Sequence, residues 1–247
     1  MFRDSVRIAL FVAALNNLDV LVFDIQNAYL TAQFREKIWT RTGTDYGSES
    51  GCIMIVMRAL YGLKSSGAAF CALLAETFCD LSYLPTKSDP DAWIRMAVKS
   101  NGFEYYEFVL YYFDGVLSIS HDPQKTMYGI KNTFKLKKDK IEEPENYSGA
   151  DISKMTTADG RVCWMMSSDQ YCKDAVANVE EKLDKANTRF PTKCGAPLTS
   201  GYKPGLDTSA DLKKDGLQTY QELIEVLRWA VEIGRIDILL EMHYALL

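Results

Sequence analysis

Residues 111–119, YYFDGVLSI, place Asp114 and Gly115 between two apolar runs. Aromatic and β-branched residues on both sides predict two adjacent strands. An Asp-Gly dipeptide between such runs is typical of a tight hairpin, because glycine adopts positive φ at no steric cost. We therefore expect a hairpin whose tip presents Asp114. At this point two interpretations are open: Asp114 is only a type I′ turn residue, or its carboxylate is presented to a metal ion.

The composition predicts a globular chain with a packed core. The 247 residues suit one large domain, or one domain with an appendage. Hydrophobic residues make up 47% and charged residues 25%, which is incompatible with wholesale disorder. The net charge of −5 and the pI near 5.2 argue against the broad basic surface of a free-standing nucleic-acid binder.

Cysteine and histidine usage argues against a structural zinc site. The six cysteines form no C-x-x-C pair, and the chain has only two histidines. No signal peptide is recognisable, so we expect reduced thiols. The longest apolar stretch, residues 8–15, is too short to span a membrane. We expect a soluble intracellular protein, cytoplasmic or nuclear, that has no contact with a membrane.

Hydrophobic periodicity predicts alternating helices and strands. Asp4 or Ser5 is expected to cap a first helix that continues to residue 15. Further helices are expected over residues 59–81, 123–135, 169–185 and in the closing segment 219–247. Strands are expected over residues 18–24, 36–41, 52–58, 91–98, 103–114, 116–120, 147–155 and 161–168. This mixed order predicts an α+β domain with a largely antiparallel sheet.

Two aspartates are placed where apolar strands end, Asp24 in LVFDIQNAYL and Asp114 in YYFDGVL. Their positions differ by 90 residues, so only the fold can bring them together. A pair of carboxylates at strand ends suits two Mg²⁺ ions, which prefer oxygen ligands and promote phosphoryl transfer. The residues alone also fit a simpler interpretation, in which Asp24 caps a following turn and Asp114 belongs to the hairpin.

Three stretches, in this order, resemble the reverse transcriptase of copia-type LTR retrotransposons. They are DIQNAYL (24–30), LYGLKSS (60–66) and YFDG (112–115), and the resemblance extends over nearly the whole chain. SDPDAW (88–93), FKLK (134–137), YSGADI (147–152) and residues 227–241 add weaker similarity. The resemblance implies a polymerase palm with a mainly antiparallel sheet covered by helices, a connecting hairpin and C-terminal helices. It implies RNA-directed DNA synthesis on an RNA or DNA template-primer from dNTPs.

The resemblance also implies roles for single residues. Asp24 and Asp114 would bind two Mg²⁺ ions, and Tyr29 would lie under the incoming sugar and exclude a 2′-hydroxyl. Gly62 and Lys64 would contact the nucleotide or the template. Without the resemblance, Tyr29 is equally well a core aromatic and Lys64 a solvated loop lysine.

The remaining implied roles concern the segments after the hairpin. Tyr147 and Gly149 would lie near the primer end, or they would only pack a hairpin. The lysine-rich residues 131–140 would touch a phosphate backbone, or they would form a solvated helix end. By the same resemblance, residues 1–145 form the palm with partial fingers, and residues 146–185 form a primer-grip-like hairpin and helix. A linker over 186–215 and a C-terminal helical segment over 216–247 complete the expected organisation.

The pattern departs from the family at Gly115, where the family has a second aspartate, and at Gly67, where it has proline. Loss of one carboxylate weakens a divalent-metal site, so we expect polymerase activity that is absent or strongly impaired. The expected basic fingers and the RNase H domain also lie outside the chain.

The alternatives are a catalytically silent nucleic-acid- or protein-binding remnant and an unrelated α+β protein. Carboxylates of Asp24 and Asp114 more than about 8 Å apart would exclude the palm. The oligomeric state is not predicted.

Overall fold

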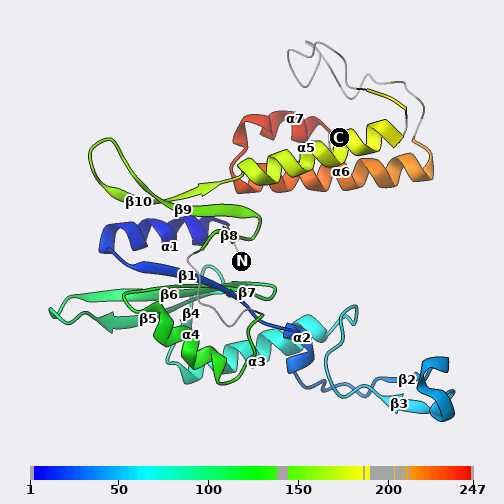
Figure 1. Cartoon of the computed structure of the whole chain (residues 1–247), viewed down its shortest axis with the longest axis horizontal. Coiled ribbons are helices and arrows are strands. Elements are labelled where there is room, and N and C mark those ends of the chain that lie inside the picture. Colours follow the sequence, from blue (N-terminus) through cyan, green and yellow to red (C-terminus); the bar gives the residue numbers. More distant parts are fainter. Residues whose placement is uncertain are drawn as a thin grey trace. The chain divides into compact units, whose positions relative to one another are not determined.

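The computed structural model describes residues 3–137, 144–185, 187–189 and 212–245, with single positions at 203, 208 and 210. The chain divides into two compact units (Figure 1). The first comprises Met1–Glu145 with Thr156–Trp164, and the second comprises Asn146–Met155 with Met165–Leu247. The two units are described separately below.

An antiparallel five-stranded sheet forms the centre of the first unit, in the order β1-β7-β6-β5-β4. Every neighbouring pair in it is antiparallel. Its strands are β1 (Asp19–Asp24), β4 (Leu84–Pro85), β5 (Ala92–Val98), β6 (Glu104–Tyr112) and β7 (Gly115–Ser120). The predicted α+β class with a largely antiparallel sheet is therefore confirmed.

Helices cover both faces of this sheet (Figure 1). Helix α1 (Arg3–Asn16) packs on one face through Val6, Ala9, Leu10 and Ala13, which have helical spacing and are all buried. Because α1 begins at Arg3, Asp4 lies in its first turn and neither Asp4 nor Ser5 is the cap. The Ser5 hydroxyl donates instead to Oδ2 of Asp89, at 2.7 Å.

The main core lies on the opposite face, under α3 (Ser66–Asp80) and α4 (Pro123–Lys131). Phe78 packs edge-on against Trp93 with ring centroids 5.3 Å apart, and Phe70 packs edge-on against Phe134 at 5.9 Å. Full burial of an apolar side chain of this size stabilises a fold by about 2 kcal/mol. These aromatic contacts hold α3 and the segment after α4 against the sheet.

Two predicted helices are shorter than expected. The helix predicted over 59–81 begins only at Ser66, because residues 60–63 form a turn. The Leu63 amide donates to the Leu60 carbonyl at 3.3 Å, and Gly62 has φ +91°, as a type II turn requires. The helix predicted over 123–135 ends at Lys131, and the chain then runs back towards the sheet, where Leu136 forms a β-bridge with Ile25.

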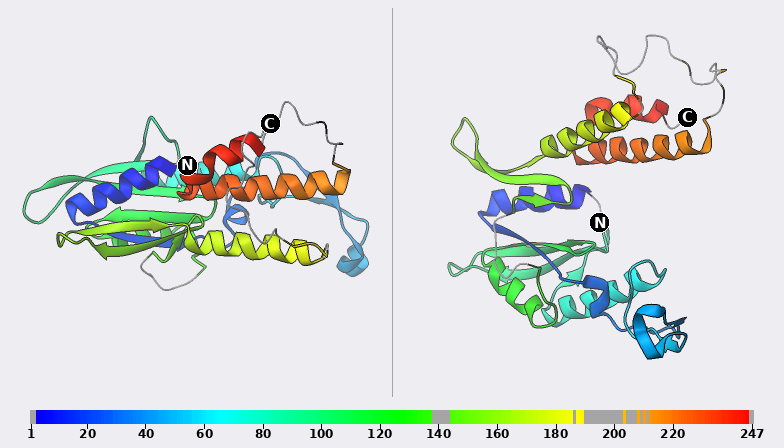
Figure 2. Two further views of the ribbon diagram at one scale, coloured as in Figure 1. Left: turned by 90° about the horizontal axis from the view of Figure 1, so that it is seen from above. Right: turned by 45° about the vertical axis from the view of Figure 1, so that its right-hand side comes forward.

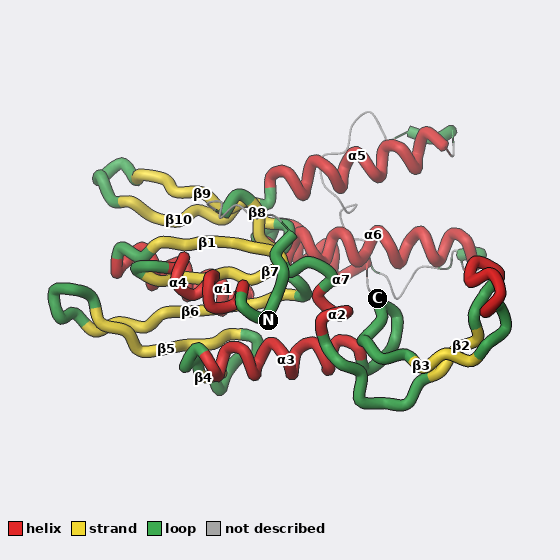
Figure 3. The backbone as a smooth tube through the Cα atoms, turned by 60° about the horizontal axis from the view of Figure 1, so that its bottom comes forward, coloured by secondary structure: helices red, strands yellow, loops and turns green. Residues whose placement is uncertain are grey.

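The connection between β1 and α3 contains α2 (Ala28–Thr31) and a two-stranded ribbon. The ribbon consists of β2 (Trp39–Arg41) and β3 (Ile53–Ile55), joined through the 3-10 helix η1 (Thr44–Glu49). It extends away from the sheet (Figure 3). Both short strands were predicted from the sequence.

The second unit combines a hairpin with a group of helices. Strands β8 (Asn146–Tyr147), β9 (Ala150–Thr156) and β10 (Val162–Ser167) form a three-stranded sheet, of which Thr156–Trp164 are counted with the first unit. Helices α5 (Asp169–Lys185) and α6 (Lys214–Ile233) lie side by side (Figures 2 and 3). The 3-10 helix η3 (Ile236–Ile238) and α7 (Leu239–Ala245) follow. Most of the predicted linker, residues 186–215, lies outside the described residues. Within the described part of the chain, no helix combines the length and apolar character needed to cross a membrane.

A buried carboxylate, Glu107, is surrounded by hydrogen-bond donors on the core side of the sheet. Arg95 lies directly opposite Glu107 on β5 and donates to its Oε2 from Nε at 2.9 Å and from Nη2 at 2.5 Å. Ser120 and Tyr105 donate to Oε1 at 2.5 and 3.0 Å. Burial by itself raises the pKa of Glu107, but the hydrogen bonds from Ser120 and Arg95 outweigh it and lower the pKa below its ordinary value of 4.5.

We predict that Glu107 makes the fold sensitive to acid. A carboxyl whose pKa is lowered by folding stabilises the fold above its unfolded-state pKa, and this contribution is lost as the pH falls through the folded-state pKa. Glu107→Gln should therefore lower the free energy of unfolding at pH 7 by about 2 kcal/mol and flatten its decline below about pH 4.5. Urea unfolding from pH 3 to pH 8 measures both effects.

Glu104→Gln is the control, because Glu104 is exposed at the start of the same strand. It should leave the pH profile unchanged. An E107Q variant that loses stability towards acid as steeply as the parent chain would contradict the assignment.

Candidate active site

The β6–β7 hairpin has a two-residue loop, which consists of Phe113 and Asp114. Tyr112 and Gly115 are paired as the last residues of the two strands. Of the two loop residues only Phe113 has positive φ, at +52°, and Gly115 does not have it. The expected role of Gly115 is therefore wrong: the turn does not use its conformational freedom. A type I′ turn needs positive φ at both loop positions, so that interpretation of Asp114 is wrong too.

The strained residue of this hairpin is Phe113. A bulky side chain in the left-handed region costs about 1–3 kcal/mol, and such residues concentrate at functional sites. The Phe113 ring is 61% exposed and packs edge-on against Tyr112 at 4.5 Å between centroids. The pairing of Tyr112 with Gly115 fixes Asp114 in the loop, and Phe113 adopts the strained conformation that this short loop requires.

The pairing of β1 with β7 brings the two predicted carboxylates to the same end of the sheet. Asp24 lies opposite Gly115 in the register, and the amide of Ile25 donates to the Asp114 carbonyl at 2.8 Å. Asp24 is thus a neighbour of the hairpin tip, although 90 positions separate it from Asp114 in the sequence.

A lysine lies between the two carboxylates. The Lys137 Nζ is 2.5 Å from Oδ2 of Asp114 and 3.7 Å from Oδ2 of Asp24. The two Oδ2 atoms are therefore at most 6.2 Å apart, the sum of these distances. This separation is within the 8 Å limit that a shared metal site sets.

The backbone positions Lys137 beside Asp24. Phe134 and Leu136 are buried in the core, and Leu136 forms the bridge with Ile25. The amide of Lys137 donates to the Asp24 carbonyl at 2.8 Å. The segment that carries the ammonium is therefore attached to the strand that carries the first carboxylate.

The three charged groups remain open to solvent. The side chains of Asp24, Asp114 and Lys137 are 50%, 36% and 45% exposed. The hydrogen bond to Asp114 raises the pKa of Lys137 above its ordinary value, and the charge of Asp24 adds to this effect. Because exposed ion pairs contribute little to stability, the arrangement matters mainly for the charge that this end of the sheet offers to a ligand.

Tyr29 connects the other two predicted stretches to this site. It lies in α2, and its ring stacks on Tyr61 with centroids 4.7 Å apart. A Cβ added at Gly67, in the first turn of α3, would lie 3.9 Å from the Tyr29 hydroxyl. Burial raises the pKa of Tyr29, and Asp114 contributes to the increase. Segments from all three motif stretches therefore meet at one end of the sheet.

A small cavity of about 210 Å³ opens next to this cluster. Its lining joins Tyr29 to the hairpin and to α3, through Phe70, Cys71, Asp91, Tyr111, Tyr112 and Phe113. Tyr29 is thus neither fully buried nor isolated on the surface: one side of its ring packs against Tyr61, and the residue also borders a cavity at the hairpin.

Gly62 and Lys64 lie on the exposed turn before α3. A Cβ at Gly62 would meet nothing within 4 Å, so this glycine is required by its φ and not by a close neighbour. The stacking residue of this turn is Tyr61, which the sequence interpretation did not single out. Its position next to Gly62 in the stretch LYGLKSS is the sequence feature that could have identified Tyr61 as a site residue.

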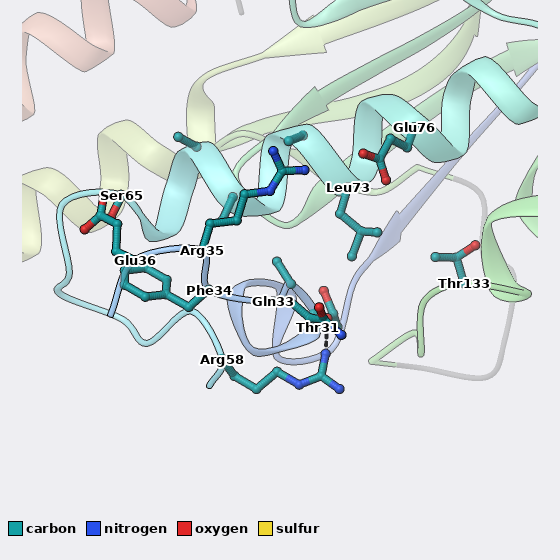
Figure 4. A pocket seen from close by; sticks show the side chains of 14 residues that line it. Thr31, Gln33, Phe34, Arg35, Glu36, Arg58, Ser65, Leu73, Glu76 and Thr133 are labelled. Carbon is teal, nitrogen blue, oxygen red and sulfur yellow. Dashed lines mark hydrogen bonds between the residues drawn. The ribbon is translucent and has the colours of Figure 1, made fainter. Parts of the chain in front are cut away.

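A larger hollow of about 660 Å³ lies between α3 and the segment that follows α2 (Figure 4). Arg35, Glu36, Arg58 and Glu76 give it charges of both signs, and Arg58 donates to the Thr31 carbonyl at 2.7 Å. Neither Asp24 nor Asp114 belongs to its lining. The hollow is therefore separate from the carboxylate pair.

The carboxylate oxygens of Asp24 and Asp114 could hold a cation between them. Carboxylate oxygens are the ligands that Mg²⁺ prefers, and the ammonium of Lys137 already lies beside both carboxylates as a cation. Among the residues that the structure describes, no group of three or more histidine, cysteine, aspartate or glutamate side chains is arranged to hold a metal. The site therefore offers two carboxylates and lacks a third.

Lys137 is a second site residue that sequence reasoning missed. The stretch FKLK was noted, but the lysine-rich segment was considered only as a phosphate contact or a solvated helix end. Helix α4 ends at Lys131, before this stretch, and Lys137 contacts both aspartates. Residues 138–140 of the segment lie outside the described part of the chain.

The two predicted primer-end residues, Tyr147 and Gly149, belong to the second unit. Ser148 and Gly149 form a two-residue loop between β8 and β9, with φ of +56° and +80°. Tyr147 is buried, and a Cβ at Gly149 would lie 3.0 Å from Nε1 of Trp229 on α6. Gly149 thus lies close to α6 within its own unit, and whether either residue also lies near a primer end stays a prediction.

Comparison with known proteins adds no family assignment. No protein-family model matches the chain, and no curated protein matches it either.

We predict that Gly149 is needed both for its backbone conformation and for the space beside Trp229. Gly149→Ala should destabilise the fold by about 2 kcal/mol, of which about 1 kcal/mol comes from the left-handed conformation and the rest from the close contact. Gly160→Ala is the matched control, because Gly160 has φ +81° and nothing within 4 Å of an added Cβ. It should cost only about 1 kcal/mol. Thermal unfolding followed by circular dichroism compares them, and equal losses would refute the packing role.

Proposed function

We propose that this chain is a copia-type reverse-transcriptase palm whose nucleotidyl-transfer activity is absent or strongly impaired. One observation carries the proposal: Asp24, Tyr29, Tyr61 and Asp114 come from three distant stretches and meet at one end of the sheet. These stretches are the ones that carry the resemblance to the family. A chance resemblance in sequence would not require them to be neighbours in space.

The proposed reaction is template-directed addition of a nucleotide to a primer. The primer 3′-hydroxyl gives up its proton to solvent and its oxygen attacks the α-phosphate of a dNTP, so that a new O–P bond forms while pyrophosphate leaves with the electrons of the broken P–O bond. Asp24 and Asp114 would hold Mg²⁺, which when bound supplies charge stabilisation for the attacking and leaving oxygens. Tyr29 would support the sugar and exclude a 2′-hydroxyl, from its position beside the hairpin.

Gly115 accounts for the proposed loss of activity. It lies directly opposite Asp24 in an antiparallel pair, and opposed residues project from the same face of a sheet. A carboxylate at position 115 would therefore face Asp24 and form the third member of a metal-binding group. With glycine there, two carboxylates remain, and one of them is hydrogen-bonded to Lys137.

Gly62 and Lys64 would contact the nucleotide or the template from the exposed turn before α3. Tyr147 and Gly149 would act near the primer end through the β8–β9 hairpin. The partners of such a site are an RNA or DNA template-primer and dNTPs.

A catalytically silent remnant that binds nucleic acid or protein is the second candidate. One observation favours it: the ammonium of Lys137 already partly neutralises the carboxylate pair. In that case the fold would persist without the chemistry.

Primer extension separates the two candidates. With poly(rA)/oligo(dT), dTTP and Mg²⁺ or Mn²⁺, we expect the parent chain to incorporate nucleotide barely above background. Gly115→Asp should raise incorporation by about 100-fold, the order of the rate loss that a misplaced catalytic group causes. Asp24→Ala in the Gly115→Asp background should abolish it.

Asp19→Asn in the same background is the control, because Asp19 is at the other end of β1. It should leave incorporation unchanged. Duplex binding without incorporation by the G115D variant would support the silent remnant instead.

A further inference from the structure

The contact between Lys137 and both aspartates has a consequence for the number of ions that the site can hold. Its ammonium is hydrogen-bonded to Asp114 and lies within ion-pair distance of Asp24. A divalent ion that binds both carboxylates has to share them with this ammonium, whose positive charge repels it. Lys137 and a metal ion therefore compete for one set of ligands.

This lysine is held in place by the backbone. Its amide is bonded to the Asp24 carbonyl, and the preceding residue, Leu136, is buried and bridged to Ile25. The neighbouring lysine of the same segment, Lys135, donates no such contact to the pair: its carbonyl accepts from the Gln26 amide at 2.7 Å, and its side chain is exposed. The segment thus directs one particular ammonium towards the carboxylates.

The charges at the site limit the ions further. Asp24 and Asp114 contribute two negative charges, and Lys137 contributes one positive charge. Gly115, which lies opposite Asp24, contributes none. One net negative charge is therefore left to balance any divalent ion that the protein binds without a nucleotide.

We propose that Lys137 serves as a built-in cation that takes one of the two metal positions, so that the carboxylate pair holds at most one divalent ion. The inference rests on the proposed function, because it takes Asp24 and Asp114 as the metal ligands. Lys137 is then a specificity-determining residue: it sets the affinity and the number of divalent ions. Its removal strengthens metal binding, whereas removal of an ordinary surface lysine has no effect.

Mn²⁺ binding measured by electron paramagnetic resonance tests the proposal without any catalytic readout. The full chain should bind at most one Mn²⁺, weakly. Lys137→Met should bind it about tenfold more tightly, because a positive charge a few ångströms away is removed from a partly solvated site. Lys137→Arg keeps the charge and should resemble the parent chain, as should Lys135→Met, the matched control from the same segment.

Asp114→Asn in the Lys137→Met background should abolish the tighter site and thereby locate it. Lys137→Gln repeats the test with a polar side chain, in case the methionine variant does not fold. Equal Mn²⁺ affinities in the parent chain and in both neutral variants would overturn the proposal, and so would two ions bound by the parent chain.

The Mn²⁺-binding experiment and the primer-extension experiment can fail independently of each other. If Gly115→Asp gives incorporation that depends on Asp24 while Lys137→Met leaves Mn²⁺ affinity unchanged, only the role of Lys137 is overturned. If Lys137→Met tightens Mn²⁺ binding at Asp114 but no variant incorporates nucleotide, the polymerase proposal fails and the built-in cation is supported.

Discussion

The antiparallel pairing of β1 with β7 is the constraint on which the candidate site depends. It aligns Asp24 with Gly115 and puts the Asp24 carbonyl and the Asp114 loop at the same end of the sheet. A slip of one residue would turn Leu21 and Phe23 away from the main core. The burial of Leu21 and Phe23 therefore also determines where Asp24 lies.

The rest of the site is attached to this pairing by a few local contacts. The segment after α4 is fastened to Ile25 by the bridge with Leu136, and it brings Lys137 to both carboxylates. Tyr29 follows β1 directly and is held by Tyr61. A rigid core thus supports an exposed group of charges, which is the usual division between scaffold and functional loops. The strained Phe113 belongs to the exposed part.

The hydrophobic pattern of the sequence predicted most helices and strands correctly and predicted their ends less well. Helix α1 has the helical spacing of its buried face, and the strands on either side of the hairpin form where the sequence predicted them. The short ribbon strands were predicted as well, although β2 is exposed at every residue. The apolar residues just before α3 and those after α4 enter a turn and a β-bridge instead of a helix. Phe134 and Leu136 are apolar because they pack in the core, and a local window cannot distinguish such packing from a helix.

The sequence by itself determined the α+β class, the antiparallel hairpin, and the placement of Asp24 and Asp114 at strand ends, because these follow from local periodicity and turn chemistry. Only the tertiary structure decided that the loop consists of Phe113 and Asp114, that Gly115 is a strand residue opposite Asp24, and that Lys137 lies between the carboxylates. The reason is physical: register and bridging depend on contacts between residues far apart in the chain. The glycine that suggested a turn is instead a strand position without a side chain, and a lysine of the basic segment lies beside both carboxylates.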